Sequence, residues 1–367
     1  MGTGSIRHPQ SMFHVKHPRR YNGVMDTPIK TLSIQQLEDC VKNAGLPKFR
    51  AGQILSWIYH KNVSSFQEMT NLPQAARDQF DASFPIYMPT IVDKQTSFDG
   101  SRKYLLELND GALVETVGLP SPDGRLTVCV SSQSGCAMAC AFCATGKAGL
   151  TRSLVPGEFI DQIHVVQDDY DERVTNVVVM GQGEPFANYD ATLAALRIMN
   201  HPKLLNIGAR HITVSTCGLI KGINTFADEP EQFTLAISLH AAHQEVRDKL
   251  MPRLASQPLK DLRRALVSYT EKTGRRFSFE YALMKNQNDS EDDLNALIAY
   301  CRGLLCHVNL IPLNNIDDSP IKPASSNQLK HWESQLQSKG IAASIRASRG
   351  SDIAAACGQL AYKRQNN

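Results

Sequence analysis

Four of the chain's nine cysteines fall within fifteen residues, in the segment CVSSQSGCAMACAFC from Cys129 to Cys143. Cys136, Cys140 and Cys143 form a C-x-x-x-C-x-x-C pattern, whose thiolates can converge on one inorganic centre from a single loop. Structural zinc almost always has four protein ligands, and no fourth ligand of the usual spacing lies beside these three. A 4Fe-4S cluster held by three cysteines leaves one iron open to a further ligand. The pattern therefore favours an iron–sulfur centre with an open position, and zinc remains the alternative.

Polar residues follow strand-like runs farther along the chain. The segment VVVMGQGEP places Gly183 and Glu184 after an apolar run, but the third glycine of a G-x-G-x-x-G dinucleotide fingerprint is missing. Further candidates stand at the ends of later runs: Ser215, Ser238, Leu239, His240 and Asn314. A single hydroxyl or amide is more often a turn or cap residue. Several of them on successive strand ends indicate a polar lining for one ligand.

Three more residues are candidates with an ordinary alternative. Cys357 follows a strand and a basic turn, and an alanine-flanked cysteine is by default a buried core residue. Glu115 lies in LVETV beside a predicted hairpin, where a glutamate is usually exposed. Cys129 lies inside a predicted strand. Position alone therefore assigns no chemistry to any of the three.

The elements that must position these residues alternate in type after Arg125. Apolar strand-like runs recur as LTVCVSS, TNVVVMG, RHITVST, FTLAISLH, RFSFEYALM, CHVNLIPL and IAASIRAS. Amphipathic helical stretches such as PGEFIDQIHVVQDDY and LKDLRRALVSYTEKT lie between most of them. Alternating strands and helices predict a parallel sheet with right-handed crossovers, here an α/β fold curled into a full or partial barrel. Ligands of such folds bind at the carboxyl ends of the strands, where the candidates lie.

The chain before this alternation is of two kinds. One part is helical and polar, with Ser33 as a predicted N-cap and Gly45 as a stop. The next alternates in polarity around the turn Asn109-Asp110-Gly111, which predicts a β-hairpin. We expect a helical accessory domain at 26–88, a hairpin extension at 89–124, the barrel at 125–350 and a C-terminal segment with Cys357 at 351–367.

Composition excludes several classes of protein. A formal net charge of +3 over 367 residues is too small to prove a polyanionic partner. The nine cysteines lack the density and pairing of a secreted disulfide scaffold, and no apolar run reaches the roughly 18 residues of a membrane span. We expect a cytoplasmic protein without a membrane partner. Residues 1–25 contain no Asp or Glu and no apolar core, so we expect a disordered leader or a start assigned too early, with a transit peptide as the alternative.

The pattern C-x-x-x-C-x-Φ-C, with Phe142 before its last cysteine, resembles the signature of the radical S-adenosylmethionine (SAM) superfamily. Together with LVETV, LTVCVSSQSGC, GQGEP, ISLH and RGSDIAAACGQL, in this order, the chain is identified as a member of the RlmN/Cfr family of RNA methyltransferases. The resemblance runs from about Leu32 to Leu360. Cys217 and Gln182 depart from the family pattern, and we expect neither to touch the chemistry.

The resemblance implies a site and a mechanism. A 4Fe-4S cluster is implied at Cys136, Cys140 and Cys143, and S-adenosyl-L-methionine at Gly183, Glu184, Ser215, Ser238, Leu239, His240 and Asn314. One SAM methylates Cys357, a second yields the radical that activates this methyl group, and Cys129 resolves the adduct through a transient disulfide with Cys357. Glu115 matches the proton acceptor of the family.

The resemblance also implies the substrates. Carbon 2 of adenosine 2503 in 23S rRNA is the expected target, together with adenosine 37 of tRNAs. A Cfr-type enzyme would instead methylate carbon 8 of the same rRNA adenosine, and the motifs alone do not separate the two. A non-catalytic iron–sulfur or zinc RNA-binding factor is the alternative from another class, but it has no use for Cys129 and Cys357.

The implied partners are 23S rRNA, tRNA and an electron donor such as flavodoxin or ferredoxin, and the enzyme is expected to be a monomer. The target adenine must turn out of the folded RNA to reach the barrel mouth. Basic residues around this mouth and in the tail are candidates for phosphate contacts. They are Arg102, Lys103, Lys147, Arg152, Arg349, Lys363 and Arg364. Each could equally be a solvated surface charge.

Overall fold

The computed structural model of this chain describes residues 28–314 and 319–360. The expected leader at 1–25 and the candidate RNA contacts Lys363 and Arg364 lie outside the described residues. The described chain forms two compact units, residues 28–53 with 63–86 and residues 54–62 with 87–360. The division into two units falls within the helix Phe49–His60, whose second half groups with the larger unit. The expected domain boundaries stay a prediction.

The smaller unit is helical. Its helices are α1 (Ile34–Asn43), the first part of α2 (Phe49–His60) and α3 (Gln74–Ser83). Ser33 caps α1 as predicted, because its side chain accepts the Gln36 backbone N–H and the Gln36 side chain accepts that of Ser33. The rings of Phe66 and Phe80, with centroids 5.6 Å apart, pack in the core of this unit.

The larger unit contains one long sheet. Among the described residues, ten strands follow the order β1-β2-β3-β4-β7-β8-β9-β10-β11-β12. The parallel part consists of β4 (Leu126–Cys129), β7 (Asn176–Val179), β8 (Ile212–Thr216), β9 (Thr234–Ser238), β10 (Phe277–Leu283), β11 (Cys306–Pro312) and β12 (Ala342–Ile345). The two edge strands, β1 and β12, do not pair with each other in the described structure, so the barrel is partial. The predicted α/β fold with a parallel sheet is confirmed.

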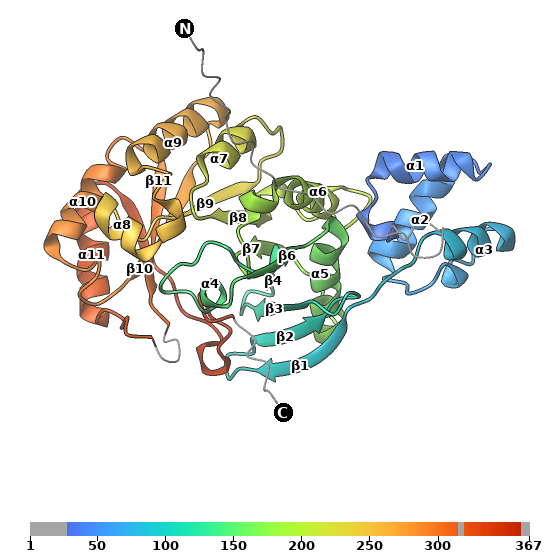
Figure 1. Cartoon of the computed structure of the whole chain (residues 1–367), viewed down its shortest axis with the longest axis horizontal. Helices are drawn as coiled ribbons and strands as arrows, with labels where there is room; N and C mark the ends of the chain where they lie inside the picture. The colour runs from blue at the N-terminus through green and yellow to red at the C-terminus, as the bar shows by residue number, and fades with distance from the viewer. Residues whose placement is uncertain (1–27, 315–318, 361–367) are drawn as a thin grey trace, which may run out of the picture. The chain divides into compact units, whose positions relative to one another are not determined.

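Helices connect the parallel strands and lie around the outside of the curved sheet (Figure 1). They are α5 (Pro156–Tyr170), α6 (Tyr189–Asn200), α7 (Ile220–Ala227), α8 (Gln244–Leu250), α9 (Leu259–Thr273), α10 (Glu291–Cys301) and α11 (Ser326–Ser338). The parallel strands are rich in Val, Ile and Leu because one face packs on these helices and the other faces the barrel interior. No described helix is long and apolar enough to span a bilayer.

The predicted hairpin is part of the same sheet. β2 (Arg102–Glu107) and β3 (Leu113–Pro120) pair across the expected turn, and β1 (Thr90–Thr96) adds a further antiparallel strand. β3 then pairs with β4, with Val117 opposite Cys129. Glu115 therefore lies on β3, the strand that pairs with β4, the first strand of the barrel.

A second, short hairpin frames the cysteine loop and was not predicted. β5 (Gln133–Gly135) pairs with β6 (Leu150–Ser153), and the short helix α4 (Ala144–Ala148) lies between them. Gly135 has φ +79°, and a Cβ there would meet the carbonyl oxygen of Gly149 at 2.0 Å. Only glycine fits this crossing of the two chain segments.

Candidate radical SAM active site

The cysteine loop is held at its start and in its middle by backbone hydrogen bonds. The Cys136 N–H donates to the carbonyl of Gly149 at 2.8 Å, which closes the loop on the β5–β6 hairpin. The Ala141 N–H donates to the carbonyl of Leu250 at 2.9 Å, which ties the middle of the loop to the end of α8. The loop is therefore fixed before any ligand binds.

The three loop thiols influence one another. Burial raises the pKa of Cys136 to about 11 and strongly raises that of Cys140, and the neighbouring Cys143 adds to both shifts. No three His, Cys, Asp or Glu side chains of the described residues converge as ligands of a single metal ion. A 4Fe-4S cluster holds its cysteines on different iron atoms, so its ligands need not meet at one point. Three neighbouring soft thiols with short spacing fit such a cluster as its donor set.

Phe142 connects the loop to the barrel. Its ring meets that of His240, just after β9, edge to face with 4.5 Å between centroids. His240 has φ +55°, and its Nδ1 accepts the Ala282 N–H at 3.0 Å. Burial lowers the pKa of His240 to about 3, so the imidazole is neutral and carries its proton on Nε2.

Glu184 is buried at the end of β7. One carboxylate oxygen accepts the Phe186 N–H at 2.9 Å, and the other accepts the Cys217 N–H at 2.7 Å. Burial raises the pKa of this carboxyl, and these hydrogen bonds oppose the rise. At Gly183, with φ +103°, a Cβ would lie 2.6 Å from the side chain of Ser132, so the backbone can pass here only without a side chain. The expected contact of Glu184 with SAM stays a prediction.

The other expected SAM contacts also lie at strand ends. The hydroxyls of Ser215 on β8 and Ser238 on β9 are 3.4 Å apart, within hydrogen-bond distance. Leu239 is fully buried, and its N–H donates to the Glu280 carbonyl at 3.0 Å. The Asn314 amide donates to the carbonyl of Cys357 at 3.2 Å. The structure thus places these residues along the ends of adjacent strands.

Cys129 and the segment around Cys357 pack together. The Cys129 side chain lies in an apolar cluster with Val117, Ala355 and Leu360, and the last two residues stand on either side of Cys357 in the chain. Burial raises the pKa of Cys129, and the thiol of Cys357 adds to the rise. Both thiols are free.

The C-terminal segment also docks on the cysteine loop. The Ala144 N–H donates to the carbonyl of Gly358 at 2.8 Å, and the Thr145 hydroxyl donates to that of Leu360. The Cys357 side chain is exposed, yet the protein around it raises its pKa, first by desolvation and then through the charge of Glu280.

Glu115 is buried, although a glutamate on a strand beside a hairpin is usually exposed. Lys103 on the neighbouring strand β2 and Gln182 in the turn after β7 lie against its side chain. Its carboxylate lies 3.5 Å from the ammonium of Lys103, and it accepts a hydrogen bond from the Gln182 amide at 3.2 Å. Burial raises the pKa of Glu115, and Lys103 opposes this rise.

Both departures from the family pattern contact carboxylates of the candidate site, and the expectation that neither touches the chemistry stays a prediction. Gln182 bonds to Glu115 through its side chain, and the Cys217 N–H donates to Glu184. GQGEP was the only sequence signal for Gln182. Glu280, which accepts hydrogen bonds from Ser278 and Asn309 at 2.8 Å, and the fully buried Arg247 were missed altogether.

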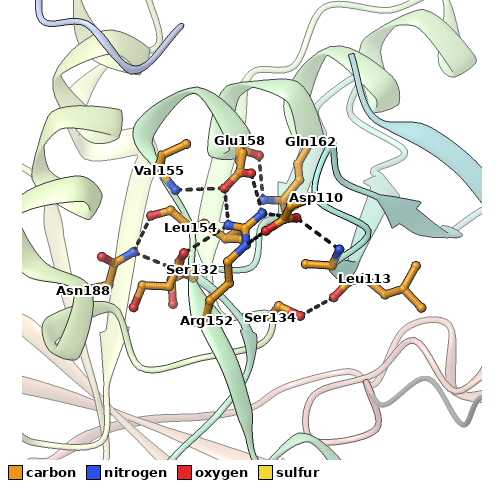
Figure 2. A network of polar contacts seen from close by, with 12 residues as sticks. Asp110, Leu113, Ser132, Ser134, Arg152, Leu154, Val155, Glu158, Gln162 and Asn188 are labelled. Carbon is orange, nitrogen blue, oxygen red and sulfur yellow. Dashed lines mark hydrogen bonds and ion pairs between the residues drawn. The ribbon is translucent and has the colours of Figure 1, made fainter. Parts of the chain in front are cut away.

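Most described candidates for RNA contacts have acidic partners within the chain. Figure 2 shows the guanidinium of Arg152 between Asp110 and Glu158, which it meets at 2.6–2.8 Å. The other pairs are Arg102 with Asp169, Lys103 with Glu115 and Arg349 with Asp99. Lys147 is exposed and makes no ion pair with the described residues. These partners reduce the charge that the four paired residues can offer to a phosphate.

Comparison with known proteins shows which proteins share this fold and cysteine loop. A family model for the radical SAM superfamily matches residues 130–298, and one for the ribosomal RNA large subunit methyltransferase N-terminal domain matches residues 28–86. The crystal structure of a radical SAM methyltransferase from Sphaerobacter thermophilus is similar, with a TM-score of 0.86 and 42% identity over 91% of this chain and 98% of that one. The fold and the cysteine loop define a radical SAM protein.

Curated relatives narrow the family. The probable dual-specificity RNA methyltransferase RlmN of Lysinibacillus sphaericus is 45% identical over 94% of this chain and 92% of its own length. That of Geobacillus kaustophilus is 47% identical, over 91% of this chain and 92% of its own length. The chain belongs to the RlmN family of radical SAM RNA methyltransferases. The family expected from the sequence is confirmed.

Proposed function

We propose that this chain methylates carbon 2 of adenosine 2503 in 23S rRNA and of adenosine 37 in tRNAs, with two SAM molecules and a methyl group carried on Cys357. The observation that carries the proposal is the packing of Cys129 against both flanks of the Cys357 segment. This segment also docks on the cysteine loop. A plain RNA-binding factor would need neither contact.

The proposed cofactors are a 4Fe-4S cluster at Cys136, Cys140 and Cys143 and SAM at the ends of β7, β8, β9 and β11. When bound, they would supply the radical chemistry that removes a hydrogen atom from an unactivated methyl group. Ser215, Ser238 and Asn314 would orient SAM, and the neutral His240 would keep the loop in place through Phe142. The helical residues 28–86 would contact RNA.

The thiol chemistry falls to Cys357 and Cys129. Cys357 must lose its proton to displace the methyl group from the sulfonium of SAM, because thiolate is the nucleophile. After the methyl carbon has joined the adenine, Glu115 would accept the ring proton. Cys129 then forms an S–S bond with Cys357 as the C–S bond to the product breaks. The released carbon takes up a proton and becomes the methyl group of the product, the unpaired electron of the adduct passes to a one-electron acceptor, and a dithiol reductant restores both thiols.

Lys103 and Gln182 would adjust the pKa of Glu115, the proposed proton acceptor. The ammonium of Lys103 favours the ionised Glu115 carboxylate, whereas burial favours the neutral acid. A carboxyl group under these opposing influences can take a proton and release it again. Lys103 also donates to the carbonyl of Ala354 at 3.3 Å, so the same ammonium links Glu115 to the Cys357 segment.

A nucleoside analysis tests the proposal. The chain is expressed in a bacterium that lacks its own enzyme of this family, and 23S rRNA and tRNA are digested and analysed by mass spectrometry. We expect 2-methyladenosine with the wild-type chain and none with Cys357→Ala. 8-Methyladenosine would show a Cfr-type target instead. RNA that is bound but never methylated by the wild type would support the non-catalytic alternative.

A further inference from the structure

Arg247 on α8 is a buried cation that the proposed mechanism does not use. Its side chain is 0% exposed. Its Nη2 donates to the carbonyl of Cys217 at 2.6 Å, while Nε and Nη1 have no hydrogen-bond partner within residues 28–314 and 319–360. A guanidinium has five N–H donors, and a buried charge without a counter-charge is strongly disfavoured. The buried guanidinium therefore favours an anionic neighbour.

The groups around Arg247 show which neighbours can supply the negative charge. No described carboxylate is within ion-pair distance of the guanidinium. The nearest carboxylate along the helix, Asp248, accepts a hydrogen bond from Gln244 instead. The remaining neighbours with acidic protons are the thiols of Cys140 and Cys217 and the hydroxyl of Tyr300, and His240 is neutral.

The cysteine loop reaches Arg247 through its own helix. Cys140 packs against the apolar cluster that contains Cys217, Leu250 and Met251. The end of α8, one turn after Arg247, accepts the Ala141 N–H. The guanidinium thus lies near the part of the loop that carries Cys140, and the two side chains interact electrostatically.

We infer that Arg247 is the counter-charge of an anionic iron–sulfur cluster at Cys140 and its two partner cysteines, and that it raises the reduction potential of this cluster. The inference rests on the proposed function. Reduction adds one electron from an external one-electron donor to the cluster and makes it more negative. A fixed positive charge in a poorly solvated site stabilises that state, because cluster potentials follow local charge, hydrogen bonding and solvent exposure. Arg247 would act on the reaction only through the charge of the cluster, so it is a positioning residue and not a catalytic one.

The test compares Arg247→Gln with Arg247→Lys in the full chain, reconstituted without oxygen. Glutamine can still donate to the Cys217 carbonyl but has no charge, whereas lysine keeps the charge. The midpoint potential is measured by a redox titration followed by electron paramagnetic resonance, and iron and sulfide are counted. We expect the Arg247→Gln cluster to be at least tenfold harder to reduce, about 59 mV lower for one electron. Arg247→Lys should stay close to the wild type.

Arg264→Met is the matched control, because it removes an exposed arginine paired with Asp261 and should leave the potential unchanged. Thermal unfolding supplies a second measurement. Without the cluster, Arg247→Gln should melt higher than the wild type, since an unbalanced buried charge is gone, and with the cluster it should melt lower. An equal potential in both proteins, or destabilisation of the cluster-free variant, including failure to fold, would overturn the inference. A wild-type chain that binds no iron would instead contradict the proposed function.

Discussion

The ring of Phe142 packs edge to face on the imidazole of His240, with 4.5 Å between the ring centroids. This contact joins the cysteine loop to the end of β9, two elements almost one hundred residues apart in the chain. The Ala141 hydrogen bond to Leu250 and the packing of Met138 and Cys140 on the cluster around Leu250 also anchor the middle of the loop.

Phe142→Ala should therefore loosen the cysteine loop. We expect the free energy of unfolding to fall by about 2 kcal/mol, from the lost aromatic pair and lost burial of the ring. The variant should also release iron faster than the wild type when a chelator is added. Phe98→Ala, which removes a fully exposed ring, is the control and should change neither measurement. Unchanged iron release in Phe142→Ala would show that the hydrogen bonds alone hold the loop.

His240 should make stability depend on pH. Its folded-state pKa of about 3 lies below the ordinary histidine value, because burial disfavours the imidazolium. The unfolded chain therefore binds one more proton at this site between about pH 6.5 and pH 3. The stability that neutral His240 contributes is fully present above about pH 6.5. Below this pH it decreases by roughly 1.4 kcal/mol for each unit by which the pH is lowered.

His240→Asn should remove this part of the pH dependence. Asparagine tolerates the positive φ of the site and can accept the Ala282 N–H. Urea unfolding at pH 7, 6 and 5 should show a shallower loss of stability than in the wild type. His331→Gln, at an exposed histidine beside Glu291, is the matched control. Equal slopes in His240→Asn and the wild type would contradict the assignment.

The two distant cysteines should fail at different steps. Cys357→Ala has no sulfur to carry the methyl group, so it should bind RNA without a covalent link. Cys129→Ala can still form the adduct but lacks the thiol that releases it. Protein expressed in that form should carry nuclease-sensitive RNA through denaturing electrophoresis. The converse pattern would exchange the two roles, and free RNA with full methylation in both variants would dismiss the two-cysteine mechanism.

Arg152 should act as a clamp within the protein more than as a phosphate contact. It bonds to the carboxylates of Asp110 in the β2–β3 turn and Glu158 on α5, and these bonds lower the pKa of Asp110. Arg152→Met should lower the free energy of unfolding by about 1 to 3 kcal/mol at pH 7. The depressed pKa of Asp110 means that its share is present at neutral pH and is lost as the pH falls through the acidic range.

Arg125→Met is the control for this clamp. Arg125 pairs with Asp123 in a solvent-exposed turn, so its removal should cost close to nothing. RNA affinity should be nearly unchanged in Arg152→Met after correction for the folded fraction. A large loss of RNA affinity with unchanged stability would make Arg152 an RNA contact after all.

Local patterns in the sequence were sufficient for the main elements of the barrel. The apolar runs became β4 and β7 to β12, because a buried parallel strand needs a continuous apolar stretch whatever its neighbours are. The polar turn at Asn109-Asp110-Gly111 likewise marked the β2–β3 hairpin. The β5–β6 hairpin was missed, since strands of three and four residues are too short to show a period.

Electrostatic environments could not be predicted in the same way. Glu115 lies on a strand beside a hairpin, where a glutamate is usually exposed, and no sequence pattern singled out Arg247. Their burial depends on Gln182 and Lys103 in one case and on Cys217 in the other, and these partners come from other elements of the fold. Hydrogen-bond partners of this kind are a property of packing, which no spacing in one segment encodes.

The sequence by itself determined the cysteine triplet, the order of strands and helices, and the family, because ligand spacing and hydrophobic period are local properties of the chain. Only the tertiary structure decided that Cys129 packs against the flanks of Cys357, that Glu115 is buried with Lys103, and that Arg247 lies near Cys140. Each of these contacts joins elements that meet only when the sheet has formed and curled. The chemistry we propose depends on that closure, since thiols on separate segments can react with each other only after the fold has brought them together.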